Sequence, residues 1–376
     1  MNEEKNQIEK LKTLSLKKLK TLVKEIKSQL PEKDQNIITY SKNFTLVLST
    51  YCSNRCSYCY FNHRVQKEQE DDNVTLLEKE KIVSTLLIAK QYDCKEALLM
   101  SGECSDHFKE VREELLKSNY QSFIEYVSSL CERLLQQNFL PHTNIGTLNY
   151  QDLKELKNYN ASMGLMLEST NNKLCKPGGV HQYSPDKLPE RRIKHIEDAG
   201  KLKIPFTTGL LLGIGEAIED RLNDLFLIKQ LNEKYGHIQE IIIQNFIPHQ
   251  GISYEPKHLI TIKETLRTAA LAKIICGNDI SIQVPPNLIR EYESFAIDLG
   301  IDDFGGISPF TKDYINPKHP WPQITYLKEI CESKGVIFKE RYPIYDKFIE
   351  KSEFCPESIK NTINNIKQNE LQRNYN

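Results

Sequence analysis

Short apolar runs alternate with longer amphipathic stretches along most of this chain. The runs at Phe44–Ser49 and Phe206–Leu211, for example, are bounded by polar turns and have the length of a buried strand. Between most such runs lie stretches with apolar residues at helical spacing, such as Leu76–Gln91 and Arg221–Lys234. This alternation of strands and helices predicts an α/β fold built on a parallel sheet.

The pattern contains eight expected strands. They are Phe44–Ser49, Glu96–Met100, His142–Ile145, Ser162–Glu168, Phe206–Leu211, Glu240–Phe246, Ser281–Val284 and Phe304–Ile307. The expected helices are Leu76–Gln91, Phe123–Gln137, Tyr150–Asn158, Pro189–Ala199, Arg221–Lys234, Ile262–Ile275 and Leu288–Leu299. Eight strands with crossover helices predict a (β/α)8 barrel of the TIM type. Because Tyr150–Asn158 and Leu288–Leu299 are short, a partial, six-stranded barrel with added elements is the alternative.

The chain divides into three expected parts. Residues 1–36 are rich in Lys and Glu, with Leu19 and Val23 on one helical face, which predicts a helical extension packed on the outside of the barrel. The barrel is expected over residues 37–345. Residues 346–376 become rich in Asn, Gln and Lys, and we expect a helical or disordered tail there.

Composition and charge exclude several classes of function. The 376 residues carry a formal net charge of −1, so there is no bulk positive field to hold nucleic acid. No stretch approaches the roughly 18 apolar residues of a membrane span. The ten cysteines and the Lys/Glu-rich start, without an apolar signal run, predict a reducing, cytoplasmic location.

Three cysteines carry the strongest chemical signal. Cys52, Cys56 and Cys59 follow the first expected strand in the spacing C-x3-C-x2-C. Three thiolates this close can hold three corners of a [4Fe–4S] cube and leave the fourth iron without a protein ligand. A zinc site would usually pair two such knuckles, and no second knuckle follows in this sequence. A disulfide framework is disfavoured by the reducing location.

The cysteine loop lies where a barrel of this type keeps its functional groups. In (β/α)8 barrels these groups stand on the loops that follow the strands, at one mouth. Polar groups also end the other expected strands. They include Gly102 and Glu103 after the second strand, Glu168 and Ser169 after the fourth, and the glycine-rich run Gly209–Glu216 at the fifth. A dinucleotide site is disfavoured because the order G-x-G-x-x-G is absent.

The cysteine spacing, with an aromatic residue before the last cysteine, resembles the signature of the radical S-adenosylmethionine (SAM) superfamily. The resemblance implies one [4Fe–4S] cluster per chain, with Cys52, Cys56 and Cys59 as its ligands. It also implies that the open iron chelates the methionine part of SAM, and that Tyr58 lies beside the adenine.

The same resemblance assigns further SAM contacts. Gly102 and Glu103 correspond to a Gly-Gly-Glu element whose backbone binds the SAM amino group. The remaining implied contacts are Glu168 and Ser169 to the ribose or the ammonium, Arg192 to the carboxylate, and Leu211 and Gly213 to the adenine. Leu211 stands where the superfamily's Gly-x-Ile-x-Gly-x-x-Glu element has isoleucine.

The substrate ligands are expected at the ends of the last strands. Amides there suit a heterocycle that offers both donors and acceptors. The segment Gly300–Pro322, with the chain's single tryptophan, is expected to cap the mouth as a long ordered loop. The candidate substrate ligands are Gln244, Asn245, Gln283, Asp302, Asp303 and Thr311. Asp303 is also the candidate proton acceptor, on its position alone.

From about residue 37 to residue 345 the chain resembles the CofG-type subunit family of FO synthase, where FO is 7,8-didemethyl-8-hydroxy-5-deazariboflavin. The resemblance rests on Ile38–Ser41, Pro205–Gly209, Gln283–Leu288 and the loop Gly-Gly-x-Ser-Pro…Asn-Pro…Pro-Trp-Pro. The related CofH-type and menaquinone-pathway enzymes are the alternative, but they diverge after the paired glycines. One departure is Asp302-Asp303-Phe304, where the CofG family usually has Asn-Asp-Trp.

This family resemblance implies a small-molecule substrate, 5-amino-5-(4-hydroxybenzyl)-6-(D-ribitylimino)-5,6-dihydrouracil, and its closure to FO with loss of ammonia. It implies methionine and 5′-deoxyadenosine as the products of SAM. An external electron donor is required, and a CofH-type subunit is the expected functional partner. No nucleic-acid or membrane partner is expected.

Overall fold

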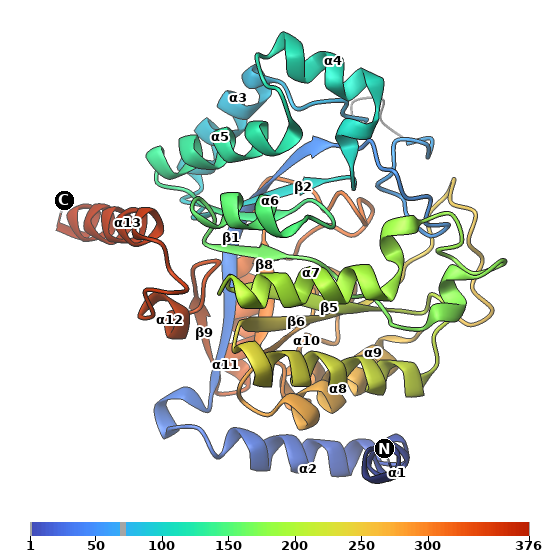
Figure 1. Cartoon of the computed structure of the whole chain (residues 1–376). Coiled ribbons are helices and arrows are strands. Elements are labelled where there is room, and N and C mark those ends of the chain that lie inside the picture. The colour runs from blue at the N-terminus through green and yellow to red at the C-terminus, as the bar shows by residue number, and fades with distance from the viewer. Residues whose placement is uncertain (1, 68–72, 376) are drawn as a thin grey trace.

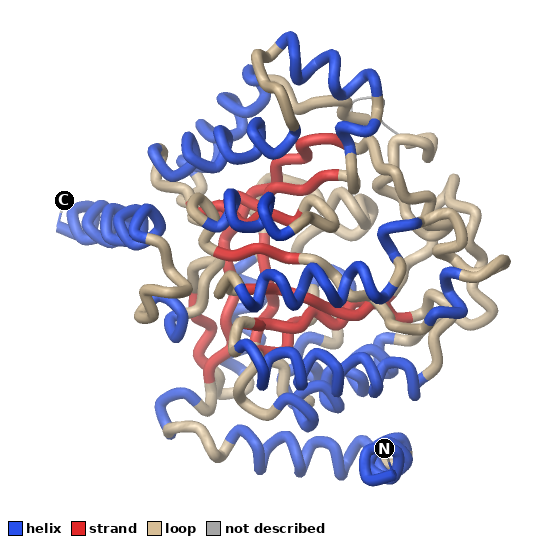
Figure 2. Tube along the Cα trace, in the orientation of Figure 1, coloured by secondary structure: helices blue, strands red, loops and turns tan. Residues whose placement is uncertain are grey.

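Parallel strands form a closed barrel at the centre of the molecule, and helices surround it (Figure 1; Figure 2). The computed structural model describes residues 2–67 and 73–375. The strands are β1 (Ile37–Ser49), β2 (Glu96–Ser101), β3 (Leu140–Asn144), β4 (Ser162–Gly164), β5 (Phe206–Leu212), β6 (Ile238–Asn245), β7 (Ser281–Gln283), β8 (Asp303–Ile307) and β9 (Ile337–Glu340).

The first strand closes the barrel. It is 13 residues long, and its second half, from Asn43 to Ser49, pairs with β2. Its first half pairs with β8, from Thr39 to Lys42. The remaining strands follow in chain order from β2 to β8, so the ring is complete. The predicted (β/α)8 barrel is confirmed, and the partial barrel is not what the chain forms.

Each of the eight expected strands is found, and one of them is much shorter than expected. The ladder of β4 spans Ser162–Gly164, whereas Ser162–Glu168 was expected. After Gly164 the chain leaves the ladder, and it rejoins the neighbouring strand in a single bridge between Glu168 and Leu210. Glu168 has a φ of 63°, a left-handed conformation that is costly for a side chain of this type.

A ninth strand lies outside the barrel and was not predicted. β9 pairs with the first residues of β1, from Ile37 to Tyr40. Its side chains alternate between exposed and half-buried, and Ile337 is 60% exposed, so the apolar run that marks a buried strand is missing. The segment after β9, Arg341–Tyr345, then folds under the barrel, where Ser162 and Gln239 both donate to the carbonyl oxygen of Pro343.

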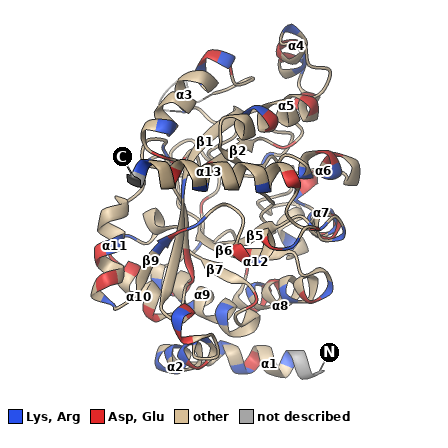
Figure 3. Ribbon diagram, turned by 90° about the vertical axis from the view of Figure 1, so that its left-hand side faces the viewer, with Lys and Arg blue, Asp and Glu red and all other residues tan. Residues whose placement is uncertain are grey.

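Helices follow most of the strands and coat the barrel. They are α1 (Asn2–Lys12), α2 (Leu16–Lys27), α3 (Lys79–Gln91), α4 (Lys109–Lys117), α5 (Phe123–Gln136), α6 (Tyr150–Lys157), α7 (Pro189–Lys201), α8 (Ile218–Tyr235), α9 (Ile262–Cys276), α10 (Glu293–Asp298), α11 (Ile324–Ser333), α12 (Asp346–Ile349) and α13 (Glu357–Tyr375). Lys and Arg are interspersed with Asp and Glu along them (Figure 3). No helix of the described residues is long and apolar enough to cross a membrane.

The two ends of the chain pack against the barrel in different places. Helix α2 buries Leu19 and Val23, and Gly300 faces it so closely that a Cβ there would lie 1.9 Å from a methyl carbon of Val23. The C-terminal helices α12 and α13 bury Phe348 and Ile359 in a second apolar cluster that also includes residues of β3 and α5. The tail is therefore helical.

We predict that Leu19→Ala destabilises the protein by roughly 2–5 kcal/mol, because it removes a fully buried side chain and leaves a cavity between α2 and the barrel. Urea unfolding followed by circular dichroism measures the loss. Lys18→Ala, on the exposed side of the same helix, is the control and is expected to change stability by less than about 0.5 kcal/mol. Equal effects of the two substitutions would contradict the packing of α2.

Candidate active site

A cavity of about 350 Å³ runs from the loops that follow the strands down into the barrel. Those loops gather on the right-hand side of Figure 2. Strand side chains that point inward alternate with period two, so each strand contributes every second residue to the wall. On β2, for example, Glu96, Leu98 and Met100 line the cavity. The cavity has a polar upper end, an apolar middle and a polar floor.

Cys52, Cys56 and Cys59 all line the upper end of this cavity. The loop that carries them has no regular secondary structure and is held by backbone hydrogen bonds to distant segments. The amide of Ser53 donates to the carbonyl oxygen of Glu103 at 2.9 Å, and that of Arg55 donates to the carbonyl oxygen of Tyr183 at 3.1 Å. The chain after β2 and the segment before α7 therefore fix the positions of the thiols.

Burial raises the pKa of all three thiols, to about 12 for Cys52. In a closed, partly apolar loop a free thiolate is unfavourable, so an electropositive ligand is needed to stabilise it. The amide of Glu103 donates to the sulfur of Cys52 at 3.2 Å, and the hydroxyl of Ser184 lies 3.3 Å from the sulfur of Cys56. Among described residues, no three His, Cys, Asp or Glu side chains are spaced to hold a single metal ion.

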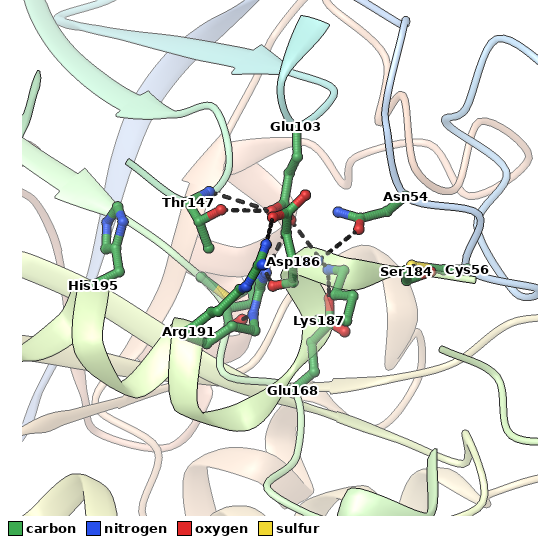
Figure 4. Close-up of polar contacts among 12 residues, drawn as sticks. Asn54, Cys56, Glu103, Thr147, Glu168, Ser184, Asp186, Lys187, Arg191 and His195 are labelled. Atoms are coloured by element: carbon green, nitrogen blue, oxygen red, sulfur yellow. Dashed lines mark hydrogen bonds and ion pairs between the residues drawn. The ribbon is translucent and has the colours of Figure 1, made fainter. Parts of the chain in front are cut away.

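Charged side chains, among them Glu103, Glu168 and Lys187, gather on the side of the cavity that holds Cys56 (Figure 4). Arg192, on α7, donates to Glu103 at 2.9 Å and to the carbonyl oxygen of Met166 at 2.6 Å. The second carboxylate oxygen of Glu103 accepts from the amide of Thr147 at 3.3 Å. Burial opposes ionisation of Glu103, but Arg192 and Lys187 outweigh it and lower the pKa of the carboxyl below its usual range.

Glu168 is the centre of a second buried group. Lys187 donates to one of its oxygens at 2.6 Å and lies 3.6 Å from Glu103, so this lysine joins the two carboxylates. The other oxygen of Glu168 accepts from the hydroxyl of Tyr58 and lies 3.2 Å from the imidazole of His181. The strained backbone of Glu168 thus directs a charged side chain at the cavity and at the tyrosine of the cysteine loop.

Gly102 lets the cysteine loop approach β2. A Cβ at this position would lie 2.1 Å from the carbonyl oxygen of Tyr51 and 2.7 Å from the Cβ of Cys52. Both are closer than atoms can pack, so a side chain at position 102 would displace the first cysteine. The glycine is therefore a steric requirement of the loop.

The floor of the cavity is a network around Arg341. This guanidinium donates to Asp303 at 2.6 Å and to Glu240 at 2.8 Å, and its carbon lies 4.3 Å from the centre of the Tyr345 ring. The hydroxyl of Tyr345 lies within donating distance of both carboxylates, 2.9 Å from Glu240 and 3.1 Å from Asp303, and its one proton is shared between them. The hydroxyl of Thr207 also donates to Glu240 at 2.9 Å. One cation and several donors thus compensate two buried carboxylates.

The comparisons with known proteins agree with this architecture. The profile of the Radical SAM superfamily matches residues 46–228. A protein named 7,8-didemethyl-8-hydroxy-5-deazariboflavin synthase, from Methanococcus vannielii, is 47% identical over 327 residues, which is 87% of this chain and 90% of the relative. Its namesake from Methanocaldococcus jannaschii is 46% identical over 327 residues, 87% of this chain and 88% of the relative. This chain belongs to the FO synthase family of radical SAM enzymes. The family resemblance inferred from the sequence motifs is thereby confirmed.

Solved structures show the same fold at low identity. The FeFe-hydrogenase maturase HydG from Carboxydothermus hydrogenoformans aligns with a TM-score of 0.65 and 18% identity, covering 95% of this chain and 80% of HydG. Methylornithine synthase aligns with a TM-score of 0.64 and 16% identity, covering 89% of this chain and 93% of that protein. The likeness supports the barrel of an FO synthase family member and carries no information on substrate.

The FO synthase family implies a [4Fe–4S] cluster and SAM, and the residues present fit both groups. Three thiols on one cavity wall offer the ligands of a cube that keeps one open iron. The charged residues beside them, Glu103, Glu168, Lys187 and Arg192, offer buried partners of both signs to an amino acid group. The amide nitrogen of Asn54, also on this wall, has no hydrogen-bond partner among the described residues.

Most of the site residues predicted from the sequence meet in this cavity. Those that line it are Cys52, Cys56, Tyr58, Cys59, Gly102, Glu103, Glu168, Arg192, Leu211, Gln244, Asn245 and Gln283. Five do not line it. Ser169 accepts from the amide of Asn171 and caps a turn, while Gly213 has its amide bonded to Glu216. Thr311 accepts from the amide of Thr45 at 3.1 Å and fastens the capping loop to β1.

The paired aspartates are placed differently from the expectation. Asp302 lies at the amino end of β8, where Lys273 is 3.1 Å and Lys27 is 3.3 Å from its carboxylate. A substrate in the cavity cannot reach it there. Asp303 lies beneath the floor, and its oxygens accept from Arg341, Tyr345 and the amide of Gly305. These contacts engage both carboxylate oxygens of Asp303 within the protein, outside the cavity lining.

Several cavity residues were missed at the sequence level. Glu96, His142 and Glu240 face inward from β2, β3 and β6, and polar side chains at alternating strand positions were the available signal. Lys187 lies five positions before Arg192, at the end of a proline-containing turn that has no motif. Arg341 follows the unpredicted strand β9, so its place in the barrel could not be deduced.

We predict that Glu96→Gln removes a pH-dependent cost of folding. Burial raises the pKa of Glu96 from 4.5 to about 7, so between these values the folded protein keeps a proton that the unfolded chain releases. Stability therefore falls as the pH rises through this window, by up to on the order of 3 kcal/mol. Urea unfolding at pH 5 and pH 8 should show that wild type loses more stability than Glu96→Gln. If wild type and Glu96→Gln lost the same unfolding free energy between pH 5 and pH 8, Glu96 would not have the raised pKa of a buried carboxyl.

Proposed function

We propose that this chain closes the deazaflavin ring of FO, starting from 5-amino-5-(4-hydroxybenzyl)-6-(D-ribitylimino)-5,6-dihydrouracil and releasing ammonia. The observation that carries the proposal is the convergence of three thiols, a buried charged group and a polar barrel interior on one cavity, in a member of the FO synthase family. The loss of ammonia makes the reaction that of a carbon–nitrogen lyase.

The proposed ligands of one [4Fe–4S] cluster are Cys52, Cys56 and Cys59. When bound, the reduced cluster supplies the electron that splits SAM into methionine and a 5′-deoxyadenosyl radical. An external donor must provide this electron. The proposal of a cytoplasmic location is supported by the ten cysteines, all of which are free thiols.

The charged residues around the cysteines are proposed to orient SAM. Arg192 and Lys187 supply positive charge for its carboxylate, and Glu103 and Glu168 supply acceptors for its ammonium and ribose hydroxyls. Tyr58 and Leu211 provide an aromatic and an apolar wall for the adenine. These four side chains hold one another in place, so their charges are already oriented when SAM enters.

The amides near the strand ends are proposed to bind the uracil ring. Gln244, Asn245 and Gln283 line the cavity, and the side-chain oxygen of Asn245 has no partner among the described residues. An amide offers a donor and an acceptor at once, which matches the alternating groups of a uracil. A CofH-type protein is proposed to supply the substrate.

The reaction itself tests the function. The anaerobically reconstituted protein, with SAM, dithionite and the proposed substrate, is expected to form one ammonia and one 5′-deoxyadenosine for each FO. Fluorescence of the deazaflavin and chromatography of the other products measure the ratio. Formation of 5′-deoxyadenosine without a deazaflavin would show that the substrate is a different one.

A substitution tests the cluster ligands. Cys56→Ala removes one of the three proposed cluster ligands from the cavity wall. We expect this variant to bind fewer than four irons per chain and to have no SAM cleavage activity. Cys175→Ala is the matched control, since this half-buried thiol lies outside the cavity lining and should leave four irons per chain. Iron and sulfide analysis, with electron paramagnetic resonance of the reduced protein, measures both. A cluster of unchanged spectrum in Cys56→Ala would exclude this cysteine as a ligand.

A further inference from the structure

Three hydrogen-bond acceptors that receive no hydrogen bond of ordinary geometry from the described residues lie side by side in the lower part of the cavity. They are the side chains of Asn43 on β1, Glu96 on β2 and His142 on β3, and we call them the acceptor arc. Each is more than nine-tenths buried. Asn43 and Glu96 are register partners on neighbouring strands, and His142 lies on the next strand along. Neighbouring strands are about 4.8 Å apart, so one small molecule can touch all three.

The hydrogen bonds of His142 determine which nitrogen carries its proton. The hydroxyl of Ser162 donates to the carbonyl oxygen of Pro343 at 2.7 Å, so its own proton is committed. Nδ1 of His142 lies 2.6 Å from that hydroxyl and must be the donor of this contact. Burial and the nearby Arg341 lower the pKa of His142 to about 3, which keeps the ring neutral. Nε2 is therefore an unprotonated acceptor in the cavity wall.

The side chains of Asn43 and Glu96 add further acceptor oxygens, and both oxygens of Glu96 accept once it ionises above its pKa of about 7. The side-chain oxygen of Asn43 is buried and has no partner among the described residues. The hydroxyl of Ser41 is the side-chain donor beside Glu96, yet it forms no hydrogen bond of ordinary geometry. Buried acceptors without donors are costly, which points to a ligand that supplies the missing donors.

On the opposite side of the floor, the acceptors already have donors from the protein. There Glu240 is already bonded to Arg341, Thr207 and Tyr345, and the amide nitrogen of Gln283 can approach it to 3.2 Å. Its acceptors are used within the protein. Within the floor of the cavity, the acceptors that lack donors among the described residues thus lie on the side of β1, β2 and β3.

We propose that the acceptor arc binds the hydroxyl groups of a polyol chain, namely the ribityl chain of the substrate. This inference rests on the proposed function, and it orients the substrate: the chain points down toward the floor, and the ring lies above it. The reacting carbons then occupy the apolar middle of the cavity, between Met100, Met166 and Leu211, on the side of the cysteines.

The chemistry of the arc favours the polyol over the ring. A uracil presents donors and acceptors in alternation, which suits the amides of Gln244 and Gln283. The arc presents acceptors, and successive hydroxyls can donate to each of them. Asn43 and the neutral ring of His142 carry no negative charge. The arc therefore stabilises an ammonium or a metal cation less well than a row of hydroxyl donors.

The test compares two ligands that differ only in the chain. FO is one probe, and the other is the same deazaflavin with a methyl group in place of the ribityl chain. Both are fluorescent, so their dissociation constants are measured by titration with the reconstituted protein, without turnover. We expect FO to bind at least 10-fold more tightly, because each hydroxyl bond is worth roughly 3- to 10-fold.

Two variants locate the effect. Asn43→Ala is expected to weaken FO roughly 3- to 10-fold and to leave the methyl compound unchanged, and His142→Phe, which keeps a ring but removes the acceptor, should do the same. Gln244→Ala is the matched control in the ring subsite and should weaken both ligands equally. Thermal melting and iron content confirm that each variant is folded and loaded.

The possible results distinguish a wrong placement of the ribityl chain from a wrong proposed reaction. If wild type makes FO from the proposed substrate but binds both probes equally, or if the arc variants weaken both probes alike, the acceptor arc does not hold the ribityl chain. If wild type neither makes nor binds FO, the proposed function fails and this inference fails with it.

Discussion

The closure of the barrel by β1 is the constraint on which the site depends. This strand pairs with β8 through its first half and with β2 through its second half, and it continues directly into the cysteine loop. Because all strands are parallel, closure brings the ends of β1, β2, β4, β5 and β6 to one rim. The cysteines, Glu103 and Glu168 come from three of these ends, and they meet for that reason.

Charge compensation is the second requirement, since the barrel interior holds many ionisable groups. The upper group balances Glu103 and Glu168 with Arg192 and Lys187. The floor balances Glu240 and Asp303 with Arg341 alone, and hydroxyl donors supply the rest. A buried carboxylate without a partner would shift its pKa and become neutral, as the raised pKa of Glu96 illustrates. Only Glu96 among these carboxylates has no cation at hydrogen-bond distance in the described structure.

The barrel and the residues at the upper end of the cavity could be predicted from the sequence. Strands that are buried on both faces read as apolar runs, and the residues that follow them are local in sequence, so Cys52, Glu103 and Glu168 could be assigned together. The floor was not predictable in the same way. Arg341 reaches it from a segment after the barrel, through a strand that is half exposed, and no local pattern reports such a contact. The contacts of Asp303 could not be deduced either, because its partners Arg341 and Tyr345 lie in that same segment.

The two polar ends of the cavity differ in how far the protein itself satisfies their polar groups. At the upper end the charges are paired with each other before any ligand enters, so the cysteine loop can be held in place by the protein alone. In the lower part the acceptor arc lacks donors, which makes the floor dependent on a ligand for full hydrogen bonding. Substrate binding should therefore stabilise the lower barrel more than SAM binding does. A radical formed above a filled, fully bonded floor would have less water near it, and exclusion of water is what protects a reactive intermediate.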